Sequence, residues 1–228
     1  MPSFFASREG GRAVIVGGDA RHLARSLRAR VGEEIEVVDP DGFLLTVRLD
    51  LVSPERVEGA IVASIEHRPE PPARITIAIA QLPAPALELV LSRCTEVGAY
   101  GFHVFRADRS VARGGKAERW STICREAAML AGRLRVPPVE GPSTLDEVLS
   151  ASGHPVLLVR GAPVDLADLG EPRDLTLCIG PEGGWSEREL ALVANRAGLG
   201  PRNLRADTAA IVGLAVALAS RRRSPSSA

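Results

Sequence analysis

Hydrophobic and polar residues alternate with a period of two along much of the first 67 residues. The runs EEIEVVD (33–39) and FLLTVRL (43–49) flank Pro-Asp-Gly at 40–42, and the run RVEGAIVASI (56–65) follows them. Such alternation is typical of strands that bury one face, and Pro-Asp-Gly between two of these runs is a turn signal. The pattern predicts a small β-barrel or β-sheet in this region.

The stretch DARHLARSLRARVG (19–32), which precedes these strands, follows a different period. Leu23 and Leu27 are four residues apart, as on one face of an α-helix. Three arginines share another face, and they are Arg21, Arg25 and Arg28. The spacing predicts a short, basic, amphipathic helix.

The pattern changes after the Pro-rich stretch RPEPPAR (68–74), which has the composition of a linker between domains. From there, apolar runs alternate with longer amphipathic segments. The expected strands are 74–81, 101–107, 154–161 and 175–180, and the expected helices are 85–98 and 116–133. Nearly continuous apolar strands separated by helices indicate a parallel sheet covered on both faces. In such sheets, ligands bind beyond the carboxyl ends of the strands.

The segment IGPEGGWSEREL (179–190) lies at one such end. Its three glycines allow positive φ or a close approach of the backbone to a ligand, and Pro181 stiffens the turn. Ser186 and Glu189 have the spacing of a capping box, and Trp185 with Leu190 that of a hydrophobic staple. We therefore expect a strand, a tight bend at a ligand site, and a helix that begins after Ser186.

A second segment of this kind is GLGPRNLRADTAAIVGLAVALA (198–219). Asp207 or Thr208 is expected to cap a long apolar helix, and Arg202 and Arg205 flank the preceding loop. Neither segment contains GKS or GKT, which excludes a Walker A loop, and neither is a GxGxxG fingerprint.

Composition narrows the class of protein further. With 228 residues, 45% of them apolar, the chain can fill one large or two modest cores. No signal peptide or membrane span is recognisable, so we expect a soluble, cytoplasmic protein. Three scattered cysteines favour reduced thiols, and four histidines without ligand spacing lead us to expect no metal. Net charge is zero, but arginines concentrate in residues 1–30 and 106–135, which is typical of surfaces that bind nucleic acid and equally of solvated faces.

Several motifs together closely resemble the RsmE family of SPOUT methyltransferases. They are HLARSLR (22–28), RCTEVGA (93–99), AGRLRVPPV (131–139), IGPEGGWSERE (179–189) and LGPRNLRADTA (199–209). The resemblance covers nearly the whole chain in the same order. It implies a PUA-like β-barrel that binds RNA at 1–67, a linker at 68–74, and an α/β SPOUT domain with a parallel sheet and a C-terminal trefoil knot at 75–228.

The resemblance also implies a cofactor, S-adenosyl-L-methionine, held in a bent conformation by three loops. These are Leu158 to Gly161, Ile179 to Gly184 and Leu199 to Ala209. The implied contacts are Leu158, Val159, Ile179, Gly180, Pro181, Glu182, Gly183, Gly184, Leu199, Gly200, Arg202, Leu204, Arg205, Thr208 and Ala209.

The implied reaction is methylation of N3 of a uridine in 16S rRNA of the 30S ribosomal subunit. A sulfonium methyl group needs little activation, so the enzyme must align the reactants and help N3 lose its proton. Glu182, Asp207 and Glu96 are acidic candidates for the base, and Arg205 could stabilise the uridine anion. The motifs do not decide among them, and Glu182 and Arg205 are our catalytic candidates.

RNA contacts are expected from six arginines, and a homodimer is expected from the resemblance. The arginines are Arg8, Arg21, Arg25, Arg28, Arg133 and Arg135. Two departures from the family pattern are Asp207, where relatives usually have Glu, and MLAGR (129–133) in place of EQCGR. Two alternatives stay open. One is a SPOUT enzyme that acts on transfer RNA or on a ribose 2′-hydroxyl, and the other is a non-catalytic RNA-binding or assembly protein.

Overall fold

The computed structural model describes residues 3–111, 117–169 and 174–220, and the chain forms two compact units. The first comprises Met1–Glu70 and Ala128–Val136, and the second comprises Pro71–Ala127 and Pro137–Ala228. The boundary between Glu70 and Pro71 falls inside the Pro-rich stretch. None of the helices described is long and apolar enough to cross a membrane.

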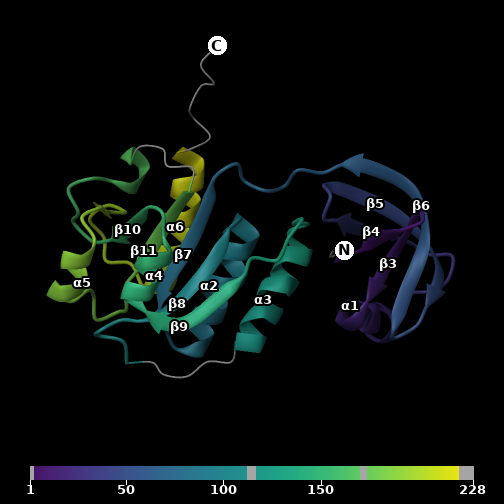
Figure 1. The fold of residues 1–228 in the computed structure, drawn as a ribbon, viewed down its shortest axis with the longest axis horizontal. Coiled ribbons are helices and arrows are strands. Elements are labelled where there is room, and N and C mark those ends of the chain that lie inside the picture. Colours follow the sequence, from purple (N-terminus) through teal and green to yellow (C-terminus); the bar gives the residue numbers. More distant parts are fainter. Residues whose placement is uncertain (1–2, 112–116, 170–173, 221–228) are drawn as a thin grey trace, which may run out of the picture. The chain divides into compact units, whose positions relative to one another are not determined.

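A six-stranded sheet forms the first unit (Figure 1). Its strands are β1 (Phe4–Phe5), β2 (Ser7–Glu9), β3 (Arg12–Val16), β4 (Glu34–Asp39), β5 (Phe43–Val52) and β6 (Arg56–Glu66), in the order β1-β4-β5-β6-β3-β2. The three strands expected from the alternating pattern are confirmed as β4, β5 and β6. Their alternate residues Ile35, Val37, Leu45, Val47 and Val57 form the core.

The segment from Phe4 to Glu9 closes this sheet. Phe4 and Phe5 pair with β4 at one edge, and Ser7–Glu9 pairs with β3 at the other, with Ala6 alone between them. The backbone N–H of Ala6 donates to the carbonyl of Val38 at 3.0 Å. Because one short segment bonds both edges, the sheet is a barrel, and the choice between barrel and open sheet is resolved.

The predicted basic helix forms in two parts, and its predicted apolar face is wrong at one position. Helix α1 (Gly17–Arg21) continues as a π-helix, η1 (His22–Leu27), which Arg28 ends with a φ of 55°. Leu23 is buried, whereas Leu27 is 45% exposed. Leu27 is the last residue of η1, next to the left-handed Arg28 that ends the helix, and its side chain is left partly uncovered there.

Residues 128–136 join the first unit because their side chains and backbone bond within it. Met129 lies in the barrel core, and its carbonyl accepts a hydrogen bond from the N–H of Ser3 at 2.9 Å. The buried guanidinium of Arg133 donates to Glu70, with Nη2 2.5 Å from Oε2. These partners are distant in sequence, so local periodicity contains no sign of them.

The second unit contains the predicted parallel sheet, which is confirmed. Its strands are β7 (Arg74–Ala80), β8 (Gly101–Arg106), β9 (Val139–Thr144), β10 (Pro155–Leu158), β11 (Asp174–Ile179) and β12 (Arg196–Ala197), in the order β12-β10-β11-β7-β8-β9. Every pairing in this order is parallel. The carboxyl ends of the central strands β10, β11 and β7 therefore share one edge.

Helices cover both faces of this sheet (Figure 1). They are α2 (Ala84–Val97), α3 (Ala117–Leu130), α4 (Leu145–Ala151), the 3₁₀ helix η2 (Leu166–Asp168), α5 (Glu187–Leu192) and α6 (Ala206–Ser220). Helix α6 packs on β7, β11 and α2. On the other face, Ala78, Ala80 and Cys178 share a core cluster with Leu145 of α4. The predicted helices 85–98 and 116–133 correspond to α2 and α3, although residue 116 lies outside the described residues.

Candidate functional site

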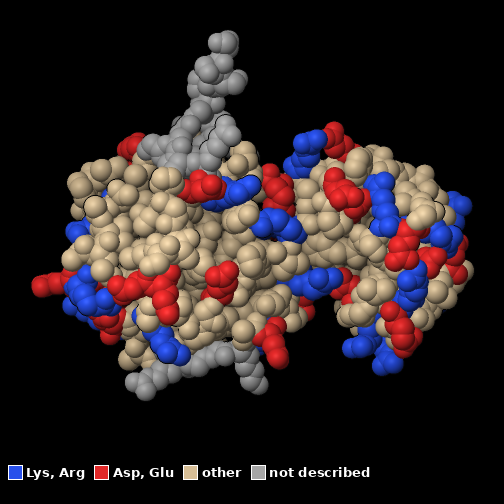
Figure 2. Space-filling model, in the orientation of Figure 1, with Lys and Arg blue, Asp and Glu red and all other residues tan. Residues whose placement is uncertain are grey.

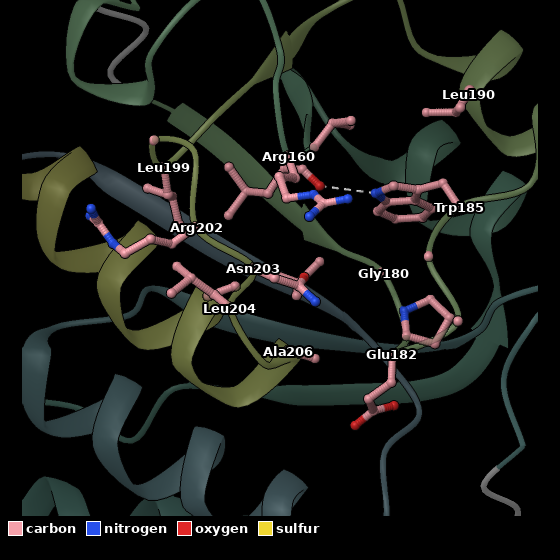
Figure 3. Close-up of a pocket in the computed structure, with 18 residues that line it drawn as sticks. Arg160, Gly180, Glu182, Trp185, Leu190, Leu199, Arg202, Asn203, Leu204 and Ala206 are labelled. Atoms are coloured by element: carbon pink, nitrogen blue, oxygen red, sulfur yellow. Dashed lines mark hydrogen bonds between the residues drawn. The ribbon is translucent and has the colours of Figure 1, made fainter.

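A pocket of about 440 Å³ opens at the carboxyl edge of the parallel sheet (Figure 3). Three connections that are distant in sequence form its walls. They are the end of β10, the bend between β11 and α5, and the loop between β12 and α6. We call residues 180–186 the glycine bend and residues 199–205 the outer loop. The volume lies within the range of pockets that hold small molecules.

The glycine bend has the local structure that its sequence predicts. The Ser186 side chain accepts a hydrogen bond from the N–H of Glu189, and the Glu189 carboxylate accepts one from the N–H of Ser186. Gly184 has a φ of 71°, a conformation that favours glycine. A β-carbon at Gly180 would lie 2.9 Å from the indole of Trp185, so only glycine fits beneath this ring.

Trp185 joins the glycine bend to the neighbouring strands. Its indole N–H donates to the carbonyl of Leu158 at 3.0 Å, as the dashed line in Figure 3 shows. Its ring stacks on Phe105 with centroids 6.0 Å apart and an angle of 6° between the planes. One side chain thus connects the ends of β8, β10 and β11. The sequence indicated only its local staple with Leu190.

A polar network fixes the start of α5 to the segment after β8. The Glu189 carboxylate, whose residue is fully buried, also accepts from the N–H of Asp108 at 2.9 Å. Asp108 accepts from the Ser186 hydroxyl at 2.5 Å and from Arg188 at 2.8 Å. Hydrogen bonds from Arg188 and Ser186 lower the pKa of Asp108 to about 2. The carboxylate is therefore ionised across the physiological range.

Helix α6 follows the outer loop. The prediction that Asp207 or Thr208 caps this helix is wrong. Helix α6 begins at Ala206, so Asp207 and Thr208 lie inside its first turn. The Asp207 carboxylate accepts from the N–H of Thr208 at 2.6 Å and from its hydroxyl at 3.1 Å. A carboxylate one position inside the helix still bonds a backbone N–H that lacks a helical partner.

The structure brings most of the expected cofactor contacts together around this pocket. The pocket is lined by Leu158, Val159, Arg160, Ile179, Gly180, Pro181, Glu182, Gly183, Gly184, Trp185, Leu190, Leu199, Gly200, Arg202, Asn203, Leu204, Ala206 and Ala209. Arg205 and Thr208 were expected here but do not line it. Trp185 and Leu190 line it although they lie outside the three expected loops, and Arg160 lies in the first loop without having been singled out.

The three acidic candidates occupy different positions. Glu182 lines the pocket and is exposed. Glu96 lies on α2, where its carboxylate accepts from Arg93 at 2.7 Å. Asp207 is bonded to Thr208, as described. Among these carboxylates, only that of Glu182 belongs to the pocket wall. Its side chain points from the glycine bend toward the rim in Figure 3.

The six arginines expected to contact RNA differ in what they bond. Arg21, Arg25 and Arg28 are exposed on α1, η1 and the residue that ends η1. Arg8 pairs with Asp39 and lies over the ring of Phe43. Arg135 lies 3.9 Å from the Glu70 carboxylate.

For Arg133 the expectation needs correction, because its side chain is only 4% exposed and pairs with Glu70. A guanidinium in this position stabilises the first unit and is inaccessible to a phosphate. Figure 2 shows basic and acidic residues interspersed on the visible face of the molecule. Within the described residues, no cluster of His, Cys, Asp and Glu is arranged to hold a metal ion.

Comparison with known proteins places these features in a family. Residues 69–218 match the family of RNA methyltransferase domains, and residues 16–62 match RNA methyltransferase PUA domains. The chain is 32% identical to ribosomal RNA small subunit methyltransferase E of Mycobacterium bovis, over 90% of this chain and 85% of that protein. It is 28% identical to the Bacillus subtilis enzyme of the same name, over 88% of this chain and 87% of that one.

Solved structures agree with the sequence comparison. Ribosomal RNA small subunit methyltransferase E from Neisseria gonorrhoeae, bound to S-adenosyl methionine, superimposes with a TM-score of 0.83 at 25% identity, covering 94% of this chain and 95% of that one. A Legionella pneumophila structure in complex with the same cofactor has a TM-score of 0.85 at 25% identity, with 96% of each chain covered. The resemblance seen in the motifs is confirmed, and the chain belongs to the ribosomal RNA small subunit methyltransferase E family.

Proposed function

We propose that this protein methylates N3 of a uridine in 16S rRNA of the small ribosomal subunit, with S-adenosyl-L-methionine as methyl donor. The observation that carries the proposal is the pocket formed by the three loops at the carboxyl edge of the sheet, in a chain of this family. Relatives named for rRNA methylation, and a relative solved with the donor, support it.

The residues around the pocket fit such a donor. Glycines at 180, 183, 184 and 200 leave backbone groups accessible, and Leu158, Leu199 and Leu204 supply apolar walls for an adenine ring. The donor supplies an electrophilic methyl group, so the protein's main task is alignment. We propose that Ile179 to Gly184 and Leu199 to Ala209 bind the nucleoside part through main-chain atoms.

Removal of the N3 proton is assigned to the rim of the pocket next to the glycine bend. We propose Glu182 as the base, because it is the pocket carboxylate among the acidic candidates and carries no hydrogen bond within the described residues. Arg205 is exposed at the end of the outer loop and is proposed to stabilise the uridine anion. Thr208 is proposed to support this loop.

RNA binding is assigned to the first unit. Arg21, Arg25 and Arg28 form a basic surface without carboxylate partners in the described part of the chain, and Arg8 and Arg135 extend the set. Contacts of this kind hold phosphates and position the RNA, while the base is selected elsewhere. We propose the division 1–67, 68–74 and 75–228 along the chain, with residues 128–136 of the last part packed in the first unit.

A trefoil knot, a homodimer and a cytoplasmic location complete the proposal. The knot is proposed from the family to which the chain belongs. The homodimer is supported by exposed aliphatic side chains on the adjacent helices α2 and α6. They are Leu89, Val97 and Val212.

Nucleoside analysis tests the proposal directly. The protein is incubated with donor carrying a labelled methyl group and with 30S subunits from cells that lack the modification. We expect label in N3-methyluridine of 16S rRNA, and none with subunits that already carry the modification. Label in a ribose 2′-hydroxyl or in transfer RNA would replace the proposed substrate, and an absence of label with intact donor binding would favour a non-catalytic role.

A further inference from the structure

Charge is distributed unevenly around the pocket. Its charged residues are Arg160, Glu182 and Arg202. In Figure 3 the guanidinium of Arg160 extends into the middle of the pocket, between Trp185 on one side and Leu199 on the other. The side chains of Glu182 and Arg202 extend toward opposite rims. The interior of the pocket therefore faces one cation and no carboxylate among the described residues.

The position of Arg160 is fixed by the backbone next to it. It lies two residues after the end of β10, and the N–H of Ala162 donates to the carbonyl of Val159 at 3.2 Å, which closes a turn that contains Arg160. Gly161 within this turn has a φ of 73°. Within the described residues, the Arg160 side chain has no ion pair or hydrogen bond, so its donors are available to a ligand.

The chemistry of the donor identifies a partner for this cation. S-adenosyl-L-methionine carries a sulfonium and an ammonium group, which a guanidinium repels, and a single carboxylate, which a guanidinium binds through two parallel hydrogen bonds. A phosphate of the RNA is the other anion present. Only the target base has to reach the methyl group, so the phosphates remain outside a pocket whose walls hold the donor.

Resting on the function proposed above, we propose that Arg160 binds the α-carboxylate of the methyl donor. Arg160 is then a positioning residue, because a clamp at the carboxylate sets the direction in which the sulfonium methyl group leaves the pocket. It also determines specificity, because analogues that lack the carboxylate lose this interaction.

Calorimetric titration with two ligands isolates the interaction. The probes are S-adenosyl-L-methionine and decarboxylated S-adenosylmethionine, which differ only in the carboxylate. The wild-type protein is expected to prefer the first by about tenfold or more, the scale of one charge-assisted hydrogen bond. Arg160→Gln is expected to lower the affinity for S-adenosyl-L-methionine by about tenfold and the affinity for its decarboxylated analogue by less than about twofold. The preference for the first ligand is then lost.

Two further variants control for folding and for charge. Arg160→Lys keeps a cation and is expected to retain part of the preference. Arg93→Gln makes the same substitution on α2, outside the pocket, and is expected to leave both affinities unchanged. Circular dichroism and thermal unfolding check that Arg160→Gln folds, as expected for an exposed side chain.

The outcomes are distinguishable. Loss of the preference in Arg160→Gln alone supports the assignment. If Arg160→Gln lowers the affinity for both ligands equally, or for neither, the assignment is overturned. If Arg160→Gln binds the donor as the wild type does but binds 30S subunits more weakly, the assignment is overturned. The guanidinium would then be assigned to an RNA phosphate. Failure of the wild-type protein to bind either ligand overturns the proposed function itself, and the assignment with it.

Discussion

The glycine bend and the outer loop face each other across one pocket, but different forces hold them. The bend is anchored by the buried Trp185, by a capping box and by the Asp108 network. In the outer loop, Arg202, Asn203 and Arg205 are exposed, and residues 199–204 form no hydrogen bond within the described part of the chain. One wall is thus held by many contacts and the other by few, so we expect the second wall to adjust more readily to what the pocket contains.

Removing the anchor of the bend is expected to have the largest effect. Trp185→Ala deletes a buried aromatic ring, and such deletions cost about 3–5 kcal/mol of unfolding free energy. It also removes part of the pocket lining and frees the carbonyl of Leu158, so we expect donor affinity to fall about tenfold, which corresponds to about 1.4 kcal/mol of binding free energy. Chemical denaturation and calorimetry measure the two effects.

Trp185→Phe is the control for this variant, because it keeps an aromatic ring near Phe105 while it removes the indole N–H and part of the ring volume. It is expected to lose less stability than Trp185→Ala. Equal donor binding in all three proteins would contradict a wall held in place by this side chain.

Crowding the bend is expected to have the next largest effect. Gly180→Ala places a β-carbon 2.9 Å from the Trp185 indole, and overpacking of this kind costs about 1–3 kcal/mol. The displaced ring moves away from Leu158, so donor affinity falls as well. Gly153→Ala is the matched control, since a β-carbon there meets nothing within 4 Å. Equal stability of the two variants would show that the ring adjusts freely.

A substitution in the outer loop is expected to lower the catalytic rate and to leave the unfolding free energy nearly unchanged. Arg205→Gln changes an exposed side chain, so the unfolding free energy should stay within about 0.5 kcal/mol of wild type. If Arg205 stabilises the uridine anion, kcat falls about tenfold, which corresponds to about 1.4 kcal/mol. Donor affinity, measured by calorimetry, should not change. A loss of donor affinity with normal kcat would instead make Arg205 part of the binding wall.

The Asp108 network is expected to give the smallest effect, and a pH-dependent one. The folded-state pKa of Asp108, about 2, lies below the ordinary value of 3.8, so ionisation favours the folded state. This contribution is complete above about pH 4 and is lost as pH falls toward 2. Asp108→Asn should therefore have a lower Tm than wild type at pH 6, and the difference should narrow between pH 4 and pH 3. A difference that is constant with pH would mean that the carboxylate charge is not responsible.

The two walls also differ in how much of their structure the sequence predicts. Ser186 and Glu189 are three residues apart, so the capping box and the bend were recognisable from local spacing. The alternation in β4, β5 and β6 was equally local. The knot, the cofactor and the named loops came from the resemblance, because neither periodicity nor composition implies them.

Contacts between distant residues could not be predicted. Asp108 and Arg188 are eighty residues apart, and Glu70 and Arg133 are separated by more than sixty. Arg133 therefore looked like one more basic surface residue, although burial against Glu70 removes it from the surface. The exposure of Leu27 was missed for another reason, since the spacing from Leu23 does not indicate that η1 ends at Leu27.

The strand that closes the barrel has a consequence for handling the protein. An unpaired strand edge is a template for pairing with another chain, and proteins commonly protect such edges. Here residues 4–9 cover β4 and β3 at once. A truncation that removes these few residues would uncover two edges of one sheet, so self-association, rather than simple loss of stability, is the hazard when the start of the chain is shortened.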